Sequence, residues 1–212
     1  MSLEDKVKDK ESKGFIKKAA RMTWKLGLAA ATTALSVATV GTLGIAVGGA
    51  FAAGGMIGNL VKRKSLYESI DSALTTYSAV NAVIYPIVLL GDLTFPLIDN
   101  ATMGGKLMRG LYASTAYNAA FLGTFRGASH LVDNYMNPKG IGKTIKKDFW
   151  RDWTMIGAMF SPFYYLAANN ITNLAMYHPS IGYNTAPTFA VGAVPVGFAH
   201  NYLFGKGTKK PH

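Results

Sequence analysis

The sequence predicts an all-α fold, a polytopic bundle of transmembrane helices with about six crossings. Half of the 212 residues are apolar and 16% are charged. The mean hydropathy of +0.17 is modest for a membrane protein. The class is therefore indicated by where the charged residues stand, namely by long uncharged runs and by a one-sided distribution of lysine and arginine.

Three stretches lack Asp, Glu, Lys and Arg altogether. They are 36 residues between Lys25 and Lys62, 20 between Asp71 and Asp92, and 53 between Asp152 and Lys206. A soluble helix needs a charged outer face, whereas about 18 apolar residues span a hydrocarbon layer of roughly 30 Å. The runs favour a membrane protein over the alternative, a soluble bundle rich in glycine and alanine.

The runs divide the chain into three parts. We expect a basic tail over 1–25, a transmembrane domain over 26–205 and a basic tail over 206–212. After residue 61, crossings are expected at 72–91, kinked at Pro86, and at 110–131, 154–176 and 185–205, with connections at 92–109, 137–153 and the turn-rich 178–184. A single helix over the last run would be about 80 Å long, so that run has to fold back.

The segment 26–61 decides the topology. As one helix it would be about 54 Å long, so either one end projects from the membrane or the chain turns back near residues 41–44. With a single crossing, ten basic residues lie on one side and twelve on the other. With a hairpin, twenty lie on one side, and only Lys106 and Arg109 on the other.

Basic residues accumulate on the cytoplasmic side, so the sequence predicts the hairpin, with both termini cytoplasmic. Each arm of about 16 residues is short for a full crossing, and a re-entrant hairpin gives the same count. Trp24, Trp150 and Trp153 then fall at the cytoplasmic interface, where indole rings accumulate.

Small residues stand four apart in two pairs in the second half of this hairpin, Gly44 with Gly48 and Gly54 with Gly58. This spacing lets helix backbones approach closely, which drives helix association in lipid. The glycines either pack the hairpin internally or form a self-associating or pore-lining surface.

The basic residues lie beside the apolar runs, and the net charge is +11. We expect their partner to be anionic lipid headgroups rather than nucleic acid. The expected headgroup ligands are Lys17, Lys18, Arg21, Lys25, Lys62, Arg63 and Lys64.

Polar side chains inside the crossings are expected to point inward, because amides need hydrogen-bond partners in hydrocarbon. These residues are Tyr77, Asn81, Asn118, Asn169 and Asn173. They either join neighbouring helices by hydrogen bonds or line a conduit or pocket for a polar solute.

Arg126, His130 and Asp133 are spaced to share one helix face. In one interpretation they form a charged cluster at the inner mouth of a pathway, where His130 could titrate near neutral pH. In the other, Arg126 extends to cytoplasmic headgroups and His130 is simply interfacial.

The residues indicate no enzymatic chemistry. The chain has no cysteine, no catalytic motif and no metal-spaced histidine pair, so we expect neither a metal nor a cofactor. The function expected is a channel or transporter for an ion or small polar solute, working as a homo-oligomer or with partner membrane subunits. The alternative is a non-catalytic accessory or scaffold subunit that packs through its Gly-rich hairpin.

Overall fold

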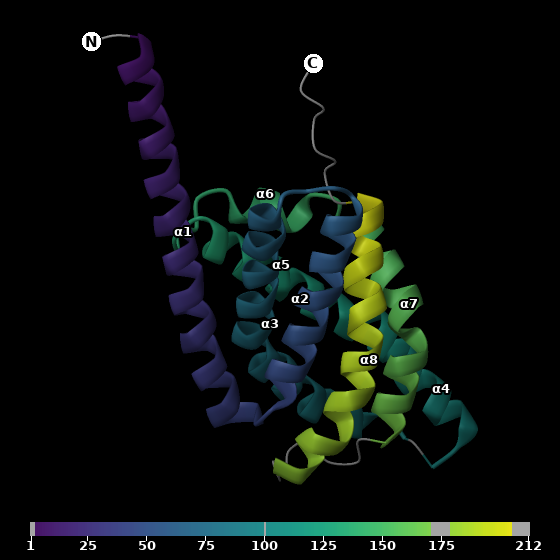
Figure 1. The fold of residues 1–212 in the computed structure, drawn as a ribbon. Helices are drawn as coiled ribbons and strands as arrows, with labels where there is room; N and C mark the ends of the chain where they lie inside the picture. Colours follow the sequence, from purple (N-terminus) through teal and green to yellow (C-terminus); the bar gives the residue numbers. More distant parts are fainter. Residues whose placement is uncertain (1–2, 100, 171–178, 205–212) are drawn as a thin grey trace.

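The computed structural model describes residues 3–99, 101–170 and 179–204, and these are almost entirely helical, which confirms the all-α fold (Figure 1). The elements are α1 (Leu3–Val40), α2 (Leu43–Val61), α3 (Leu66–Thr94), the 3₁₀ turn η1 (Phe95–Leu97), α4 (Met103–Tyr112), the π-helical η2 (Ala113–Tyr117), α5 (Asn118–Asp133), α6 (Ile141–Lys146), α7 (Phe149–Asn170) and α8 (Pro179–Phe204).

The predicted turn in 26–61 is present. α1 ends at Val40, and Gly41 has a φ of +61°, a left-handed conformation that glycine adopts without steric cost. α2 then runs back alongside the bundle (Figure 1). The boundary expected at residue 25 is not a structural break, because α1 is one helix from Leu3 onward; the tail 206–212 lies outside the described residues.

A capping box starts α3 directly after the Lys62–Lys64 turn. The Ser65 hydroxyl accepts a hydrogen bond from the Glu68 amide at 3.2 Å, and the Glu68 carboxylate accepts one from the Ser65 amide at 3.1 Å. These bonds satisfy backbone donors that the first turn of a helix otherwise leaves unpaired. The chain therefore reverses direction between α2 and α3 after only a short connection.

The expected connection over 92–109 is largely helical, which corrects the sequence prediction. α3 extends to Thr94, and α4, η2 and α5 form one continuous helical path from Met103 to Asp133. Helix α7 crosses this path at the π-helical turn: a Cβ on Gly157 would lie 2.8 Å from the Ser114 carbonyl. Trp153 donates to the Thr115 carbonyl at 2.9 Å, so its indole points into the bundle rather than to the interface.

Two further boundaries differ from the sequence prediction. The connection 137–153 contains the short helix α6, and α7 already begins at Phe149. Residues 179–184 of the expected turn lie in α8, which begins at Pro179, and His178 lies outside the described residues. Gly182 and Asn184 are typical of turns, so the sequence did not predict a helix here. A proline in the first turn of a helix loses no hydrogen bond, which explains why α8 can begin at Pro179.

The long helices alternate in direction, so the connections gather at two ends of the bundle (Figure 1). The connections 62–65 and 134–148 lie at one end, here called the basic end, which carries Lys62, Arg63, Lys64 and the lysines around α6. The turn at 41–42 and the connection 98–102 lie at the other. Among the described residues, two helices, Leu43–Val61 and Leu66–Leu97, are long and apolar enough to cross a membrane.

Phe51 joins two apolar cores. One core lies between α2, α3 and the end of α1, and consists of Val40, Leu43, Val47, Val80, Ile84 and Val88. The other lies between η1, η2, α5, α7 and α8, and consists of Phe95, Ala113, Leu122, Ile156, Phe160, Ala193 and Val196. Phe51 of α2 packs against both, which places it near the centre of the bundle.

The four predicted packing glycines lie on two faces of α2. Gly44 lies against Ser36 of α1 and Asn81 of α3, and Gly48 faces Asn81, while Gly54 and Gly58 lie against the backbone of α8. The glycines thus pack within the chain: Gly44 meets the other arm of the hairpin as well as α3, and the other three pack against α3 or α8. Gly197 of α8 completes this contact, because a Cβ there would meet the Phe51 carbonyl.

Candidate functional site

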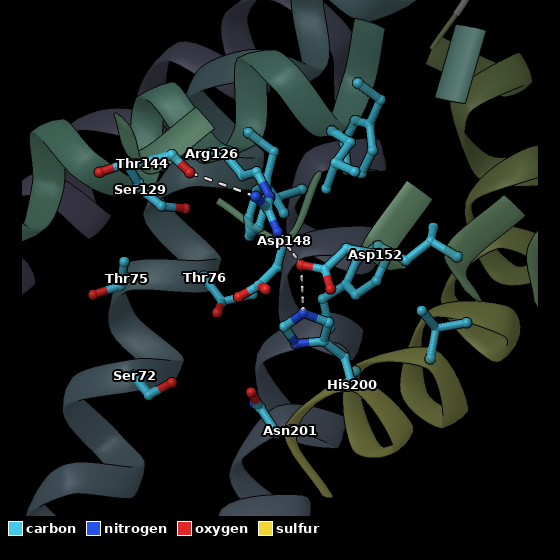
Figure 2. Close-up of a pocket in the computed structure, with 18 of the residues that line it drawn as sticks. Ser72, Thr75, Thr76, Arg126, Ser129, Thr144, Asp148, Asp152, His200 and Asn201 are labelled. Carbon is cyan, nitrogen blue, oxygen red and sulfur yellow. Dashed lines mark hydrogen bonds and ion pairs between the residues drawn. The ribbon is translucent and has the colours of Figure 1, made fainter. Parts of the chain in front are cut away.

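A cavity of about 430 Å³ opens at the basic end between α2, α3, α5, α7 and α8 (Figure 2). The exposed residues Lys147, Asp148 and Arg151 form its mouth. Hydroxyl groups line one wall, at Ser72, Thr75, Thr76, Ser129 and Thr144. Its apolar floor is formed by Phe51, Val80, Phe121, Leu122, Phe125, Ile156 and Val196.

Asp152 is the centre of the charged wall. Its side chain is 3% exposed and forms ion pairs with three groups from three helices: Arg126 of α5, Arg151 of α7 at 2.8 Å and His200 of α8 at 3.2 Å. Figure 2 shows the His200 ring directed at this carboxylate. One buried carboxylate therefore holds α5, α7 and α8 together at the edge of the cavity.

The environment of Asp152 favours its charged form. Burial by itself raises the pKa of this carboxyl, but the hydrogen bond and charge of His200, together with Arg151 and Arg126, lower the pKa to about 2. Charge-assisted bonds to a carboxylate stabilise the ionised state more than burial penalises it here. Asp152 is consequently ionised throughout the physiological pH range.

Arg126 does not extend to headgroups, which corrects one of the two interpretations. Besides Asp152, its guanidinium donates to the carbonyls of Thr144, Ile145 and Lys147, at the end of α6. The last carbonyls of a helix lack partners within the helix, so an arginine aimed at them satisfies them. Arg126 thereby fixes the connection that forms the mouth of the cavity.

Arg126, His130 and Asp133 share a helix face but form no common cluster. His130 contacts Thr144 Oγ1 at 2.8 Å and the Lys139 carbonyl at 3.1 Å, so it anchors the 134–148 connection. Asp133 instead pairs with Arg21 and Lys25 of α1. Arg126 and His130 thus meet the same connection at Thr144, whereas Asp133 faces α1.

Lys25 and Arg21 are not placed as headgroup ligands. The Lys25 side chain is fully buried, with its ammonium 2.8 Å from Asp71, 2.7 Å from Asp133 and 2.6 Å from the Thr75 hydroxyl. Arg21 donates to the same two carboxylates. A buried lysine needs such partners, because an unpaired charge in this position is strongly unfavourable. This network fastens α1 to α3 and α5 beside the cavity.

The remaining expected headgroup residues are more accessible. Lys17, Lys18 and Arg63 are exposed, whereas Lys62 and Lys64 are partly buried. Lys18 lies 5.4 Å from the centre of the Tyr67 ring.

Aromatic rings close the cavity on the side away from its mouth. Phe51 stacks on Phe121 and on Phe160, with ring centroids 6.3 Å and 5.6 Å apart, and Phe121 stacks on Phe125. The stack draws on α2, α5 and α7, the helices that meet at the centre of the bundle. The apolar end of the cavity is therefore a layer of phenylalanine rings.

Of the predicted polar intramembrane residues whose side chains are described, the structure places only Arg126 on the cavity. The Tyr77 hydroxyl lies 2.9 Å from Thr33 of α1, and Asn81 packs beside the α2 glycines and donates to the Tyr77 carbonyl. Asn118 donates to the Trp153 carbonyl at 3.1 Å. These side chains join helices in pairs and do not follow one path.

Asn169 lies in α7, but its side chain is not among those described, and Asn173 lies outside the described residues. Within the described residues, no group of three or more His, Asp or Glu side chains is placed to hold a metal ion.

Sequence reasoning missed most of the cavity. Asp71 with Thr75 and Ser72 with Thr76 are each four residues apart, and this spacing was the available signal for a polar face at the start of α3. His200 and Asn201, near the end of the last uncharged run, also line the cavity. The pairing of His200 with Asp152 joins residues 48 apart, and no local pattern indicates it.

Comparison of the chain with protein-family models, with curated proteins and with solved structures finds no match.

Proposed function

We propose that this chain is a multi-pass membrane protein whose long helical segments cross the bilayer six times, with the basic end cytoplasmic, and that it acts as a channel or transporter. The observation that carries the transport proposal is the cavity at the basic end. It is polar at its mouth, accessible from one side, and closed by aromatic rings toward the centre of the bundle.

The surface of the bundle supports the membrane part of the proposal. Large apolar side chains are exposed along most helices, among them Leu35, Leu89, Leu93, Leu107, Leu111 and Val191. Buried positions meanwhile include Lys25, Ser78, Asn81, Asn118 and Asp152. Such side chains are costly to expose to water in large numbers, whereas lipid solvates them. Lys25, Asn118 and Asp152 find their polar partners inside the bundle, as a bilayer requires.

The distribution of charge supports the orientation. The basic connections 62–65 and 134–148 lie at the same end, and the connection 98–102 with Lys106 and Arg109 at the other. Arg109 is itself buried and donates to the Ile98 carbonyl at 2.6 Å. Cytoplasmic connections carry the excess of lysine and arginine, so the basic end is assigned to the cytoplasm.

The cavity supports transport more than a purely structural role. Ligand pockets commonly have volumes of about 300 to 1,000 Å³, and this one lies within that range. In this proposal the described conformation faces the cytoplasm. Passage then requires Phe51 and Phe121 to separate, which would open the layer between the cavity and the opposite end.

Blocking a single introduced cysteine tests the proposal, because the native chain has none. Ser72→Cys places a thiol on the cavity, whereas Ala73→Cys places one on the next residue of α3, which does not line it. Liposomes with either variant would be tested separately for movement of potassium, chloride and benzoate. We expect a charged methanethiosulfonate to reduce flux through Ser72→Cys and to leave Ala73→Cys unchanged.

Two results would count against this function. One is that none of the three solutes crosses faster than in protein-free liposomes. The other is that thiol modification reduces flux equally through both cysteine variants, which would mean that the flux does not pass through the cavity.

The accessory-subunit alternative has less support. It relies on the Gly-rich hairpin to bind partner helices, but Gly54 and Gly58 lie against α8, Gly48 against α3, and Gly44 against both α1 and α3. A partner helix would have to displace a helix of the same chain. Homo-oligomerisation through another surface remains part of the proposal, with native mass in detergent as its measurement.

A further inference from the structure

We infer that the cavity binds an organic anion with an apolar body, its carboxylate or phosphate at the mouth and its apolar part on the phenylalanine floor. This inference rests on the cavity named in the proposed function, and deepens it by naming the class of solute.

The charges around the cavity favour an anion over a cation. Five permanent cations stand on or beside it, namely Arg21, Lys25, Arg126, Lys147 and Arg151, against the carboxylates of Asp71, Asp133, Asp148 and Asp152. The carboxylates already accept ion pairs: Asp71 and Asp133 from α1, Asp152 from three partners, and Asp148 from Arg151 at 3.5 Å. A cationic solute would therefore have to compete with the protein's own cations.

Lys147 supplies the surplus positive charge. Its side chain is exposed at the mouth, and none of the described carboxylates forms an ion pair with it. Its backbone carbonyl accepts from Arg126, which fixes the position of the residue at the cavity edge. An ammonium held at the opening of an otherwise neutralised cavity is suited to an anionic group of the solute.

The floor selects for an apolar body. Phe51, Phe121 and Phe125 form a stacked series, and Val80, Leu122, Ile156 and Val196 add aliphatic surface around it. A small inorganic anion could not use this surface, whereas a ring or a short alkyl chain would bury it. The charged mouth and the apolar floor together fit an amphipathic anion.

Equilibrium dialysis of the full chain in phosphatidylcholine nanodiscs tests the inference, with empty nanodiscs as baseline. The probes are 2-naphthoate, 2-naphthylmethylammonium and acetate. We expect saturable binding of naphthoate, binding of the ammonium probe about tenfold weaker, and no saturable binding of acetate. Equal or tighter binding of the ammonium probe would overturn the inference.

A matched pair of variants locates the anionic group. Lys146 and Lys147 are adjacent and both exposed, but only Lys147 lines the cavity. Lys147→Gln should weaken naphthoate binding about fivefold, while Lys146→Gln should leave it unchanged. Both variants remove the same charge from the same connection, so equal effects would show that the binding is a general surface attraction and would overturn the assignment.

Two sources of such an anion can be separated. Repeating the dialysis in nanodiscs that contain phosphatidylglycerol weakens naphthoate binding if a lipid headgroup occupies the cavity, and leaves it unchanged if the solute is water-soluble. Failure of the inference also differs from failure of the proposed function. Naphthoate binding without flux would remove transport but keep the ligand class, whereas cavity-dependent flux without naphthoate binding would do the reverse.

Discussion

Replacing Gly58 by alanine tests the close contact between α2 and α8. A Cβ at this position would lie 2.7 Å from the Phe198 carbonyl oxygen and 3.2 Å from the Tyr202 nitrogen. Both are backbone atoms of α8, so no side chain can rotate away, and the helices have to separate. Gly49 of the same helix is the matched control, because nothing lies within 4 Å of a Cβ built there.

The two substitutions have opposite expected effects. Overpacking of a tight contact costs about 1 to 3 kcal/mol, while glycine to alanine in an open helical position gains up to about 1 kcal/mol. For a chain of this size, the loss in Gly58→Ala corresponds to a melting temperature about 3 to 9 °C lower. Gly49→Ala should melt at the temperature of the wild type or slightly above it.

The measurement is thermal unfolding of both variants in the same detergent, followed by circular dichroism. Equal melting temperatures for Gly58→Ala and Gly49→Ala would refute the reasoning. That result would mean that α8 does not pack on the glycine face of α2, and the assignment of these glycines to internal packing would fail.

Two further predictions concern the charged groups beside the cavity. The folded pKa of Asp152, about 2, lies below the unfolded value of about 3.9, so its ion pairs stabilise the fold above pH 4, by about 2 kcal/mol, and this contribution disappears as pH falls from 4 to 2. Asp152→Asn should therefore melt below the wild type at pH 7, with a difference that shrinks toward pH 3; a constant difference would contradict this. Lys25→Met should cost about 2 to 3 kcal/mol, because Asp71 and Asp133 would keep only Arg21 as a cationic partner. Lys17→Met, at an exposed position of α1, should change stability by less than about 0.5 kcal/mol in denaturant titrations, and equal losses for the two lysines would show that the Lys25 network is not stabilising.

Patterns local in sequence predicted the helices well. The uncharged runs and the charge count indicated that 26–61 turns back, and the break lies at Gly41, within the segment expected. An uncharged run is read from neighbouring residues, and the charge count is a sum over the connections. Neither requires knowledge of which residues meet in three dimensions. Helix ends were less predictable: Met103 starts α4 in a segment that Gly104 and Gly105 made look irregular. There the Thr102 side chain caps the helix by accepting from the Gly105 amide at 3.1 Å.

The candidate site depended on contacts that sequence spacing does not show. Lys25 was expected at the lipid surface because it follows the helical spacing of Lys17, Lys18 and Arg21, yet the packing of α1 on α3 buries it against Asp71. His200 faces Asp152 because α7 and α8 bring together residues far apart in the chain. Polar residues in the middle of the crossings mark contacts between pairs of helices. Polar residues near the helix ends line the cavity.

Single-cysteine labelling from each side of the membrane tests the central claim most directly. The first part of α1, which contains Ser12, and the connection 62–65 lie toward the basic end, whereas α3 leads to the opposite end before Ala101 (Figure 1). Ser12, Ser65 and Ala101 are all exposed. In oriented vesicles, an impermeant thiol reagent should label Ser12→Cys and Ser65→Cys from one side and Ala101→Cys only from the other. Labelling of Ser12→Cys and Ser65→Cys from opposite sides would contradict the hairpin. Labelling of Ser65→Cys and Ala101→Cys from the same side would contradict the crossing of α3 and the cytoplasmic cavity that depends on it.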